Sequence, residues 1–136
     1  MGDVIVWPNE IGAVTICYPT GELPLDEVLA KDCPAGAIII SALSLPQNQG
    51  VFFEAWELNN GSVAVNLEKA KQIGHTIRRA ERAKEFAPLD IKATIPAEAA
   101  AAEAARQVIR DKYSAIQSQI DAAQSPDEIK AALGIN

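Results

Sequence analysis

The sequence predicts an α+β fold, with a small N-terminal antiparallel sheet and a short helix followed by a C-terminal helical hairpin or long helix. Residues 1–66 contain short apolar, β-branched runs separated by turn residues. Residues 67–136 are rich in alanine and charged residues, and their apolar positions recur every three or four residues. A chain of 136 residues suits one domain, or a small domain with a helical appendage. We therefore divide it into a β-rich head, 1–66, and a helical region, 67–136.

The first apolar runs predict strands on either side of a short helix. Residues 4–7 (VIVW) and 13–18 (AVTICY) are separated by PNEIG, whose turn residues predict a β-hairpin. The next segment predicts a two-turn helix at about 24–31, with Pro24 in its first turn. The run 37–43 (AIIISAL) is almost continuously apolar and rich in isoleucine, which predicts a buried strand.

The segment VFFEAWEL holds three of the seven aromatic residues of the chain, Phe52, Phe53 and Trp56. A strand and a helix would both gather these rings into a cluster, and we favour a strand over 52–58. The sequence NNG then predicts a hairpin turn to a second strand over 62–66. Burial of each large aromatic side chain contributes about 1.5–3 kcal/mol, so we expect these three residues to anchor the core.

Helical spacing begins after Asn66, which is a suitable N-cap for a helix over 67–86. We expect Pro88 to end this helix and 87–95 to form a linker or extended bridge. Strong helix formers then predict a second helix over 96–123.

A final short helix is predicted by the sequence SPDE. Ser125 is its expected N-cap, Pro126 its first residue and Glu128 the third residue of a capping box. The helix should run to Leu133, with Gly134 at its C-terminal end.

The predicted 96–123 helix carries only a thin apolar seam, which Lys112 interrupts. Its alanine-rich surface is too small to hold a solitary helix against a small sheet. We expect it either to pack on the 67–86 helix or to meet another chain. The seam consists of Ala102, Ala105, Ile109, Ile116, Ile120 and Ala123.

Charge is distributed unevenly along the chain, whose net charge is −6. Residues 1–66 contain eight acids and one base, whereas residues 67–136 contain ten acids and eleven bases. The acidic first half argues against binding to nucleic acid or to an anionic membrane surface. The sequence has no apolar run of the roughly 20 residues that a membrane span needs, and no basic N-terminal signal region. We therefore expect the protein to act in the cytoplasm.

Residues that could carry chemistry are few. His75 is the only histidine, and it lies in a basic helical segment with no nucleophile motif beside it. Cys17 and Cys33 match no zinc or redox spacing, so we interpret them as two half-buried thiols. Glu54 and Glu57 flank an aromatic residue, but such acids commonly solubilise a strand. The sequence therefore predicts no catalytic, cofactor-binding or metal-binding residues, no cofactor, and no enzymatic activity.

The basic stretch Lys69–Lys84 has two interpretations that bear on binding. Glu81 lies among its basic residues and Glu85 follows them, and no aromatic residue lies within the stretch. Nucleic acid is therefore not the expected ligand. A solvated helix face, or a surface for an acidic protein partner, fits better. We predict partner contacts, including a homo-oligomer through the helices, on the helix faces that contain Ile73, Ile77, Arg78, Arg79, Arg82, Ile109, Tyr113, Ile116 and Ile120.

Four short motifs, in order along the chain, resemble a known family. They are KDCPAG at 31–36, FEAWE at 53–57, HTIRRAER at 75–82 and SPDEI at 125–129. Together they resemble a family of small tailed-bacteriophage proteins encoded among tail or tail-fibre genes. The layout of a β-rich head and a helical tail is also similar to that of tail-fibre assembly chaperones. This sequence departs from the family pattern at 93–105, where it is rich in alanine, and at its end, which lacks the usual tryptophan.

The resemblance implies a non-enzymatic protein that acts by protein–protein contacts. Its expected role is tail-fibre assembly factor or minor tail subunit, and its expected partner is a tail-fibre or tail protein. It would act in the cytoplasm of the host cell during assembly and, where retained, in the virion tail. The alternative is a phage-encoded inhibitor of a host or defence protein, because an acidic chain can mimic an anionic ligand.

Overall fold

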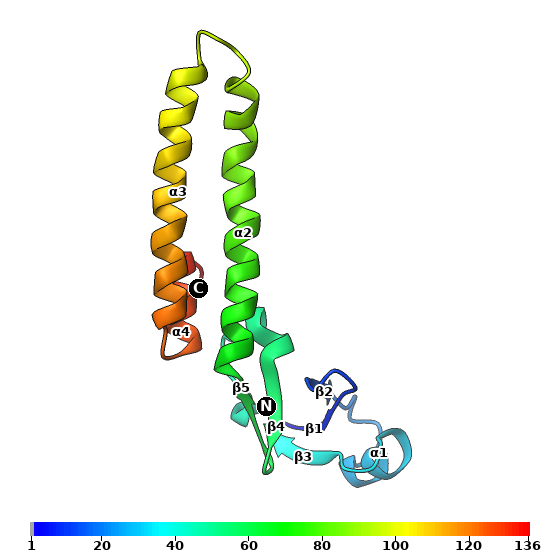
Figure 1. Ribbon diagram of the computed structural model, residues 1–136. Coiled ribbons are helices and arrows are strands. Elements are labelled where there is room, and N and C mark those ends of the chain that lie inside the picture. The colour runs from blue at the N-terminus through cyan, green and yellow to red at the C-terminus, as the bar shows by residue number, and fades with distance from the viewer. Residues whose placement is uncertain (1) are drawn as a thin grey trace. The chain divides into compact units, whose positions relative to one another are not determined.

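The structure, a computed structural model, describes residues 2–136 and has the predicted α+β fold (Figure 1). Short antiparallel strands come first and long helices follow. The chain divides into two compact units, one that ends at Lys69 and one that comprises Ala70–Asn136. We call residues 2–69 the head and residues 70–136 the helical unit. The division lies in the first turn of the helix that follows Asn66.

The first sheet of the head contains β1 (Asp3–Pro8), β2 (Val14–Cys17) and β3 (Ile38–Ser41). The order is β2–β1–β3, and both outer strands run antiparallel to β1. In the turn between β1 and β2, Asn9 Oδ1 accepts hydrogen bonds from the backbone N–H groups of Ile11 and Ala13 at 3.1 and 3.0 Å. The predicted hairpin is therefore confirmed.

β3 is shorter and less buried than the sequence predicts. The expected strand over 37–43 gives way after Ser41 to a 3₁₀ turn, η1 (Ala42–Ser44), in which Ser41 Oγ accepts a hydrogen bond from the Leu43 N–H at 3.2 Å. Its three isoleucines are half-buried and not fully buried, because β3 is an edge strand of the first sheet.

The predicted helix at about 24–31 is confirmed as α1 (Leu25–Asp32). The Pro24 carbonyl accepts hydrogen bonds from the N–H groups of Glu27 and Val28 at 3.1 and 3.2 Å. No residue of α1 is fully buried, so the helix adds little to the core of the head.

The second sheet is a hairpin of β4 (Trp56–Asn59) and β5 (Ser62–Val65), as predicted. Asn60 and Gly61 have φ angles of 52° and 83°, which are the left-handed values that a type I′ hairpin turn requires. Residues from both sheets form the core of the head, which contains Val4, Val6, Val14, Leu45, Trp56 and Val63.

The aromatic segment differs from the predicted strand over 52–58. Residues 50–55 form 3₁₀ turns, η2 (Gly50–Ala55), and the strand begins only at Trp56. The Gln49 carbonyl explains the turn, because it accepts hydrogen bonds from the Phe52 N–H at 3.0 Å and from the Trp56 indole at 3.1 Å. Phe52 and Trp56 are buried. Phe53 remains 39% exposed, with its ring edge-on to that of Trp56 at 5.0 Å between centroids.

The helix after Asn66 begins as predicted but ends later. In α2 (Leu67–Lys92), Asn66 Oδ1 caps the first turn by accepting a hydrogen bond from the Lys69 N–H at 3.1 Å. Pro88 lies inside the helix, so the predicted end at Pro88 is wrong, and of the linker predicted over 87–95 only residues 93–95 lie outside a helix. Proline removes only its own backbone donor, and the following residues resume the ladder, as in the bond from Ala93 N to Leu89 O at 2.9 Å.

Two further helices complete the helical unit, α3 (Ala99–Ala122) and α4 (Pro126–Leu133). α3 begins three residues after the predicted start at residue 96, because 93–98 form the turn that joins it to α2. The predicted N-cap of α4 is present, but the return bond from Glu128 reaches the residue before the cap and not Ser125 itself. Ser125 Oγ accepts from the Glu128 N–H at 3.3 Å, and the Glu128 carboxylate accepts from the Gln124 N–H. Gly134 ends the helix with a φ of 71°.

The alanine-rich seam of α3 packs within the chain, since α2 and α3 form an antiparallel hairpin (Figure 1). Ala102, Ile109 and Ile120 of the predicted seam are buried, and Tyr113 fills the place where Lys112 was expected to interrupt it. Gly74 of α2 allows side chains of α3 and α4 to approach closely. A Cβ atom at this position would lie 2.8 Å from Ile129 Cγ2 of α4 and 3.6 Å from Ile120 Cγ2 of α3.

Candidate functional site

The nine predicted partner residues fall into three groups by exposure. Arg78, Ile109, Tyr113 and Ile120 are buried within the chain. A second group is half-buried and contains Ile73, Ile77, Arg82 and Ile116. Arg79 is exposed. Most of the predicted apolar contacts are therefore used to join the helices. Of the arginines in the set, Arg79 and Arg82 line a groove.

That groove lies on the helical unit and has a volume of about 450 Å³. We call it the arginine groove. Small alanines, Ala83 and Ala87, leave room between its larger side chains. It is lined by Arg79, Arg82, Phe86 and Asp90 from α2 and by Arg106 and Arg110 from α3.

The two arginines from α3 are held by acids at the edge of the groove. Arg110 Nη1 lies 2.8 Å from Glu103 Oε1, and Arg106 Nη1 lies 3.3 Å from Glu103 Oε2. The hydrogen bond from Arg110 lowers the pKa of Glu103, and the same bond raises the pKa of Arg110. Arg106 and Arg110 therefore line one side of the groove, and the carboxylate of Glu103 offsets part of their positive charge.

Arg106 also carries a donor without an acceptor. Its Nε atom lies 3.3 Å from Asp90 Oδ1, within ion-pair distance, but the orientation makes no hydrogen bond. The Nε atom is nevertheless buried, and a buried donor without an acceptor is uncommon in native structures.

The two arginines from α2 are not compensated in this way. Within residues 2–136, neither Arg79 nor Arg82 forms an ion pair or a side-chain hydrogen bond. Their charge reaches the neighbouring Arg78, whose pKa is lowered first by burial and then by repulsion from Arg79 and Arg82. The groove is therefore a region of unbalanced positive charge on a chain whose net charge is negative.

Arg78 belongs to a chain of hydrogen bonds that includes the single histidine. His75 Nε2 lies 2.8 Å from Asp121 Oδ1, and Arg78 Nε donates to His75 Nδ1 at 3.2 Å. The tautomer that satisfies both contacts carries its proton on Nε2. Lys71 Nζ also donates to the Asp121 carbonyl, at 3.0 Å. These hydrogen bonds together join α2 to α3.

A second hollow of about 450 Å³ lies beside Tyr113 and the C-terminal residues Leu133–Ile135. The Tyr113 hydroxyl donates a hydrogen bond to the Glu85 carboxylate, which also pairs with Lys112 Nζ at 3.2 Å. Burial and this hydrogen bond raise the pKa of Tyr113 to about 12. The bond from Tyr113 also lowers the pKa of Glu85. This cluster fastens α3 to α2.

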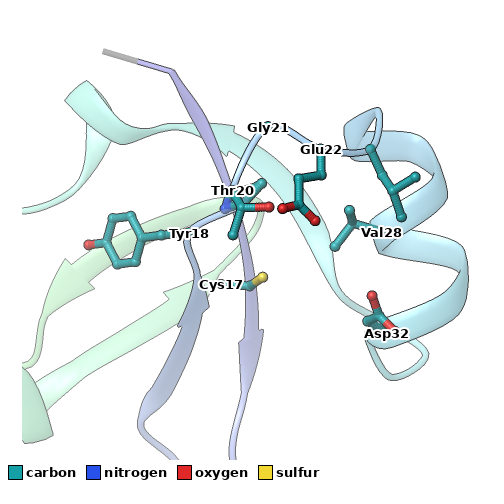
Figure 2. A pocket seen from close by; sticks show the side chains of 9 residues that line it. Cys17, Tyr18, Thr20, Gly21, Glu22, Val28 and Asp32 are labelled. Carbon is teal, nitrogen blue, oxygen red and sulfur yellow. The ribbon is translucent and has the colours of Figure 1, made fainter.

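The head has a smaller cavity of about 250 Å³ between the end of β2 and α1 (Figure 2). The Glu22 carboxylate lies between the β2 side, with Cys17 and Thr20, and the α1 side, with Val28 and Asp32. Cys17 and Cys33 are both half-buried thiols, as predicted. Burial and the neighbouring Cys17 and Asp32 raise the pKa of the Cys33 thiol.

The two acids that flank Trp56, Glu54 and Glu57, differ in their contacts. Glu57 Oε2 pairs with Lys69 Nζ at 2.7 Å and Oε1 accepts from Asn66 Nδ2 at 3.0 Å, whereas Glu54 is exposed. The bond from Lys69 lowers the pKa of Glu57. Between residues 2 and 136 the structure contains no cluster of three or more His, Cys, Asp or Glu side chains suited to a metal ion. In the same range, no helix has the length and apolar character to cross a membrane.

Sequence reasoning found only part of the arginine groove. It singled out Arg79 and Arg82, but Phe86, Arg106 and Arg110 were not among the predicted partner residues. The available signal was the spacing of Arg106 and Arg110, four residues apart and therefore on one face of a helix. Their position opposite Arg82 depends on the register between α2 and α3, which the spacing does not reveal.

Comparison of the chain with protein-family models, with curated proteins and with solved structures found no match.

Proposed function

We propose that this chain is a non-enzymatic, phage tail-associated protein, a tail-fibre assembly factor or minor tail subunit, that binds another protein through its helical hairpin. The observation that supports binding is the arginine groove, in which Arg79 and Arg82 have no acidic partner among the described residues. Arginine is enriched in protein–protein interfaces, where its planar guanidinium makes paired hydrogen bonds.

Exposed apolar side chains at the connecting end of the hairpin support the same proposal. Ile91, at the end of α2, is 68% exposed, and Ile95, in the turn to α3, is 42% exposed. A binding surface that combines such residues with arginine would gain both apolar burial and polar specificity.

The non-enzymatic part of the proposal is supported by the contacts of His75. Both of its ring nitrogens already make hydrogen bonds, one to Asp121 and one from Arg78. Its acceptor nitrogen, Nδ1, faces the Arg78 guanidinium, which is not a nucleophile that a general base could activate. His75 therefore has a structural role in joining α2 and α3.

The association with a phage tail rests on the resemblance of the four sequence motifs, and co-expression tests it. The tail-fibre protein encoded beside this chain should be captured with it and should become more soluble. A fibre protein that is neither captured nor made more soluble would defeat the proposal.

A second candidate function, inhibition of a host or defence protein, is favoured by the acids of the head. Asp3, Glu10, Glu22, Asp26 and Glu27 are all exposed, and residues 1–66 contain a single base. Such a surface could occupy a site made for an anionic ligand. Phage that lack the gene would then assemble normal particles but grow poorly on certain hosts, whereas defective particles would rule this candidate out.

A further inference from the structure

We infer that the arginine groove binds an acidic helix of a protein partner, which places two carboxylates on Arg79 and Arg82 and an apolar side chain on Phe86. The inference rests on the proposed function, because it names the chemistry of the partner that the hairpin contacts.

The spacing of the two free guanidiniums defines the carboxylates. Arg79 and Arg82 are three residues apart on α2, so they lie on one face of the helix with about 5–6 Å between their Cβ atoms. Two carboxylates one turn apart on a partner helix have the same separation. Each can accept a pair of parallel hydrogen bonds from one guanidinium.

The opposite wall is basic but already paired with acids. Arg106 lies 3.3 Å from both Asp90 and Glu103, and its Nε atom is buried, so it shapes the groove and is not expected to contact the ligand. Arg110 is already bound to Glu103 and Gln107, at 2.8 and 3.0 Å, so it orients the wall and is not expected to move to the ligand.

The floor of the groove is apolar. Phe86 lies one turn beyond Arg82 on the same face of α2 and is half-buried, with Ala83 and Ala87 beside it. The short alanine side chains leave space over the ring. A leucine or similar side chain, one turn beyond the second carboxylate of the partner, would therefore cover Phe86.

The balance of charge favours a protein over a nucleic acid. Nucleic acid binding takes its strength from many neutralised phosphates, and only two guanidiniums here are free of acidic partners. Asp90 and Glu103 lie at the groove and would repel a continuous run of phosphates. The net charge of −6 would also oppose the approach of a polyanion.

Fluorescence anisotropy with a synthetic helical peptide tests the inference. The peptide carries two glutamates one turn apart and a leucine one turn further, and a control peptide carries glutamines instead. The acidic peptide should bind the full chain, and binding to the R79Q/R82Q variant should be about tenfold weaker or worse, because two charge-assisted contacts are lost.

A matched variant, K84Q/K92Q, removes two positive charges from the same helix outside the groove. Lys84 pairs only with Glu81, at 3.0 Å on an exposed surface, so its loss should change peptide affinity by less than about twofold. Both variants should keep the wild-type circular dichroism and melting temperature, since Arg79 and Arg82 have no partners to lose and the exposed pair of Lys84 with Glu81 adds little stability.

Equal binding of the two peptides, or equal binding by R79Q/R82Q and wild type, would overturn the inference. Tighter binding of a single-stranded oligonucleotide than of the acidic peptide would also overturn it. Capture of the tail-fibre protein by R79Q/R82Q as well as by wild type would reject the groove but leave the proposed function standing. Peptide binding without capture of the fibre protein would support the groove and count against the proposed function.

Discussion

Tyr113 joins α3 to α2 through a single side-chain hydrogen bond. Its ring is buried and its hydroxyl donates to the Glu85 carboxylate of α2. The sequence placed Tyr113 on a partner surface, but the structure uses it within the chain. Its position next to Lys112 concealed this, since a lysine at a seam position indicates exposure while the neighbouring residue points inward.

Replacement of Tyr113 by phenylalanine should lower the free energy of unfolding by about 1 kcal/mol at neutral pH, because the hydrogen bond to Glu85 is lost. The pKa of Tyr113, about 12 in the folded protein, exceeds the ordinary value of 10.0. The unfolded chain therefore releases this proton first as pH rises. The resulting stabilisation is complete below pH 10 and is lost between about pH 10 and about pH 12.

Urea unfolding of wild type and Tyr113→Phe over this pH range measures the effect. The difference in stability between the two proteins should shrink as pH rises from about 10 to about 12. Tyr18→Phe is the control, because Tyr18 is 67% exposed and has no side-chain partner among residues 2–136. A constant difference in stability between wild type and Tyr113→Phe would show that folding does not raise the pKa of Tyr113.

At the scale of the elements, close packing at Gly74 brings α2, α3 and α4 together. Glycine weakens an exposed helix by about 1 kcal/mol relative to alanine. The structure shows the compensating reason, since no Cβ atom fits between α2 and Ile129 without movement.

The Gly74→Ala substitution should therefore destabilise the protein by about 1 kcal/mol, despite the better helix propensity of alanine. The clash is with Ile129 Cγ2, a methyl group close to the backbone of α4 that cannot rotate away freely. In an Ile129→Ala background the same substitution should cost less, because that methyl group is gone. Thermal unfolding followed by circular dichroism measures both, with exposed Ser114→Ala as the control. A stabilising effect of Gly74→Ala would show that the three helices do not pack here.

Pro88→Ala tests the length of α2. Within a helix, proline removes a backbone hydrogen bond and crowds the preceding turn, so alanine should raise the free energy of unfolding by about 1 kcal/mol or more and should increase the helical signal. If α2 ended before Pro88, as the sequence predicts, alanine would leave both measurements unchanged or would lower the stability. Urea unfolding and circular dichroism at 222 nm distinguish the two results.

Elements were predictable where one residue fixes the local backbone. Asn66, Ser125 and Gly134 marked helix ends correctly, and NNG marked the β4–β5 turn. The errors lie where no single residue marks the backbone conformation. The Gln49 carbonyl, seven residues from Trp56, turns 50–55 into 3₁₀ turns, and the ladder of α2 continues past Pro88.

Across the whole molecule, an acidic head and a nearly balanced helical region carry different chemistry. Sequence charge revealed this division, and Arg79 and Arg82 were among the residues it singled out for binding. It could not reveal that Asp90 of α2 pairs with Arg106 of α3 and so leaves Arg79 and Arg82 without an acid, because that pair depends on the side-by-side placement of α2 and α3.

Hydrogen–deuterium exchange of the chain, alone and in complex with the co-expressed tail-fibre protein, tests the central claim most directly. We expect slower exchange in the complex across the groove-lining parts of α2 and α3, at residues 79–90 and 103–110, and little change in the two sheets of the head. Protection confined to the head, or no protection anywhere, would contradict the claim that the hairpin is the binding surface.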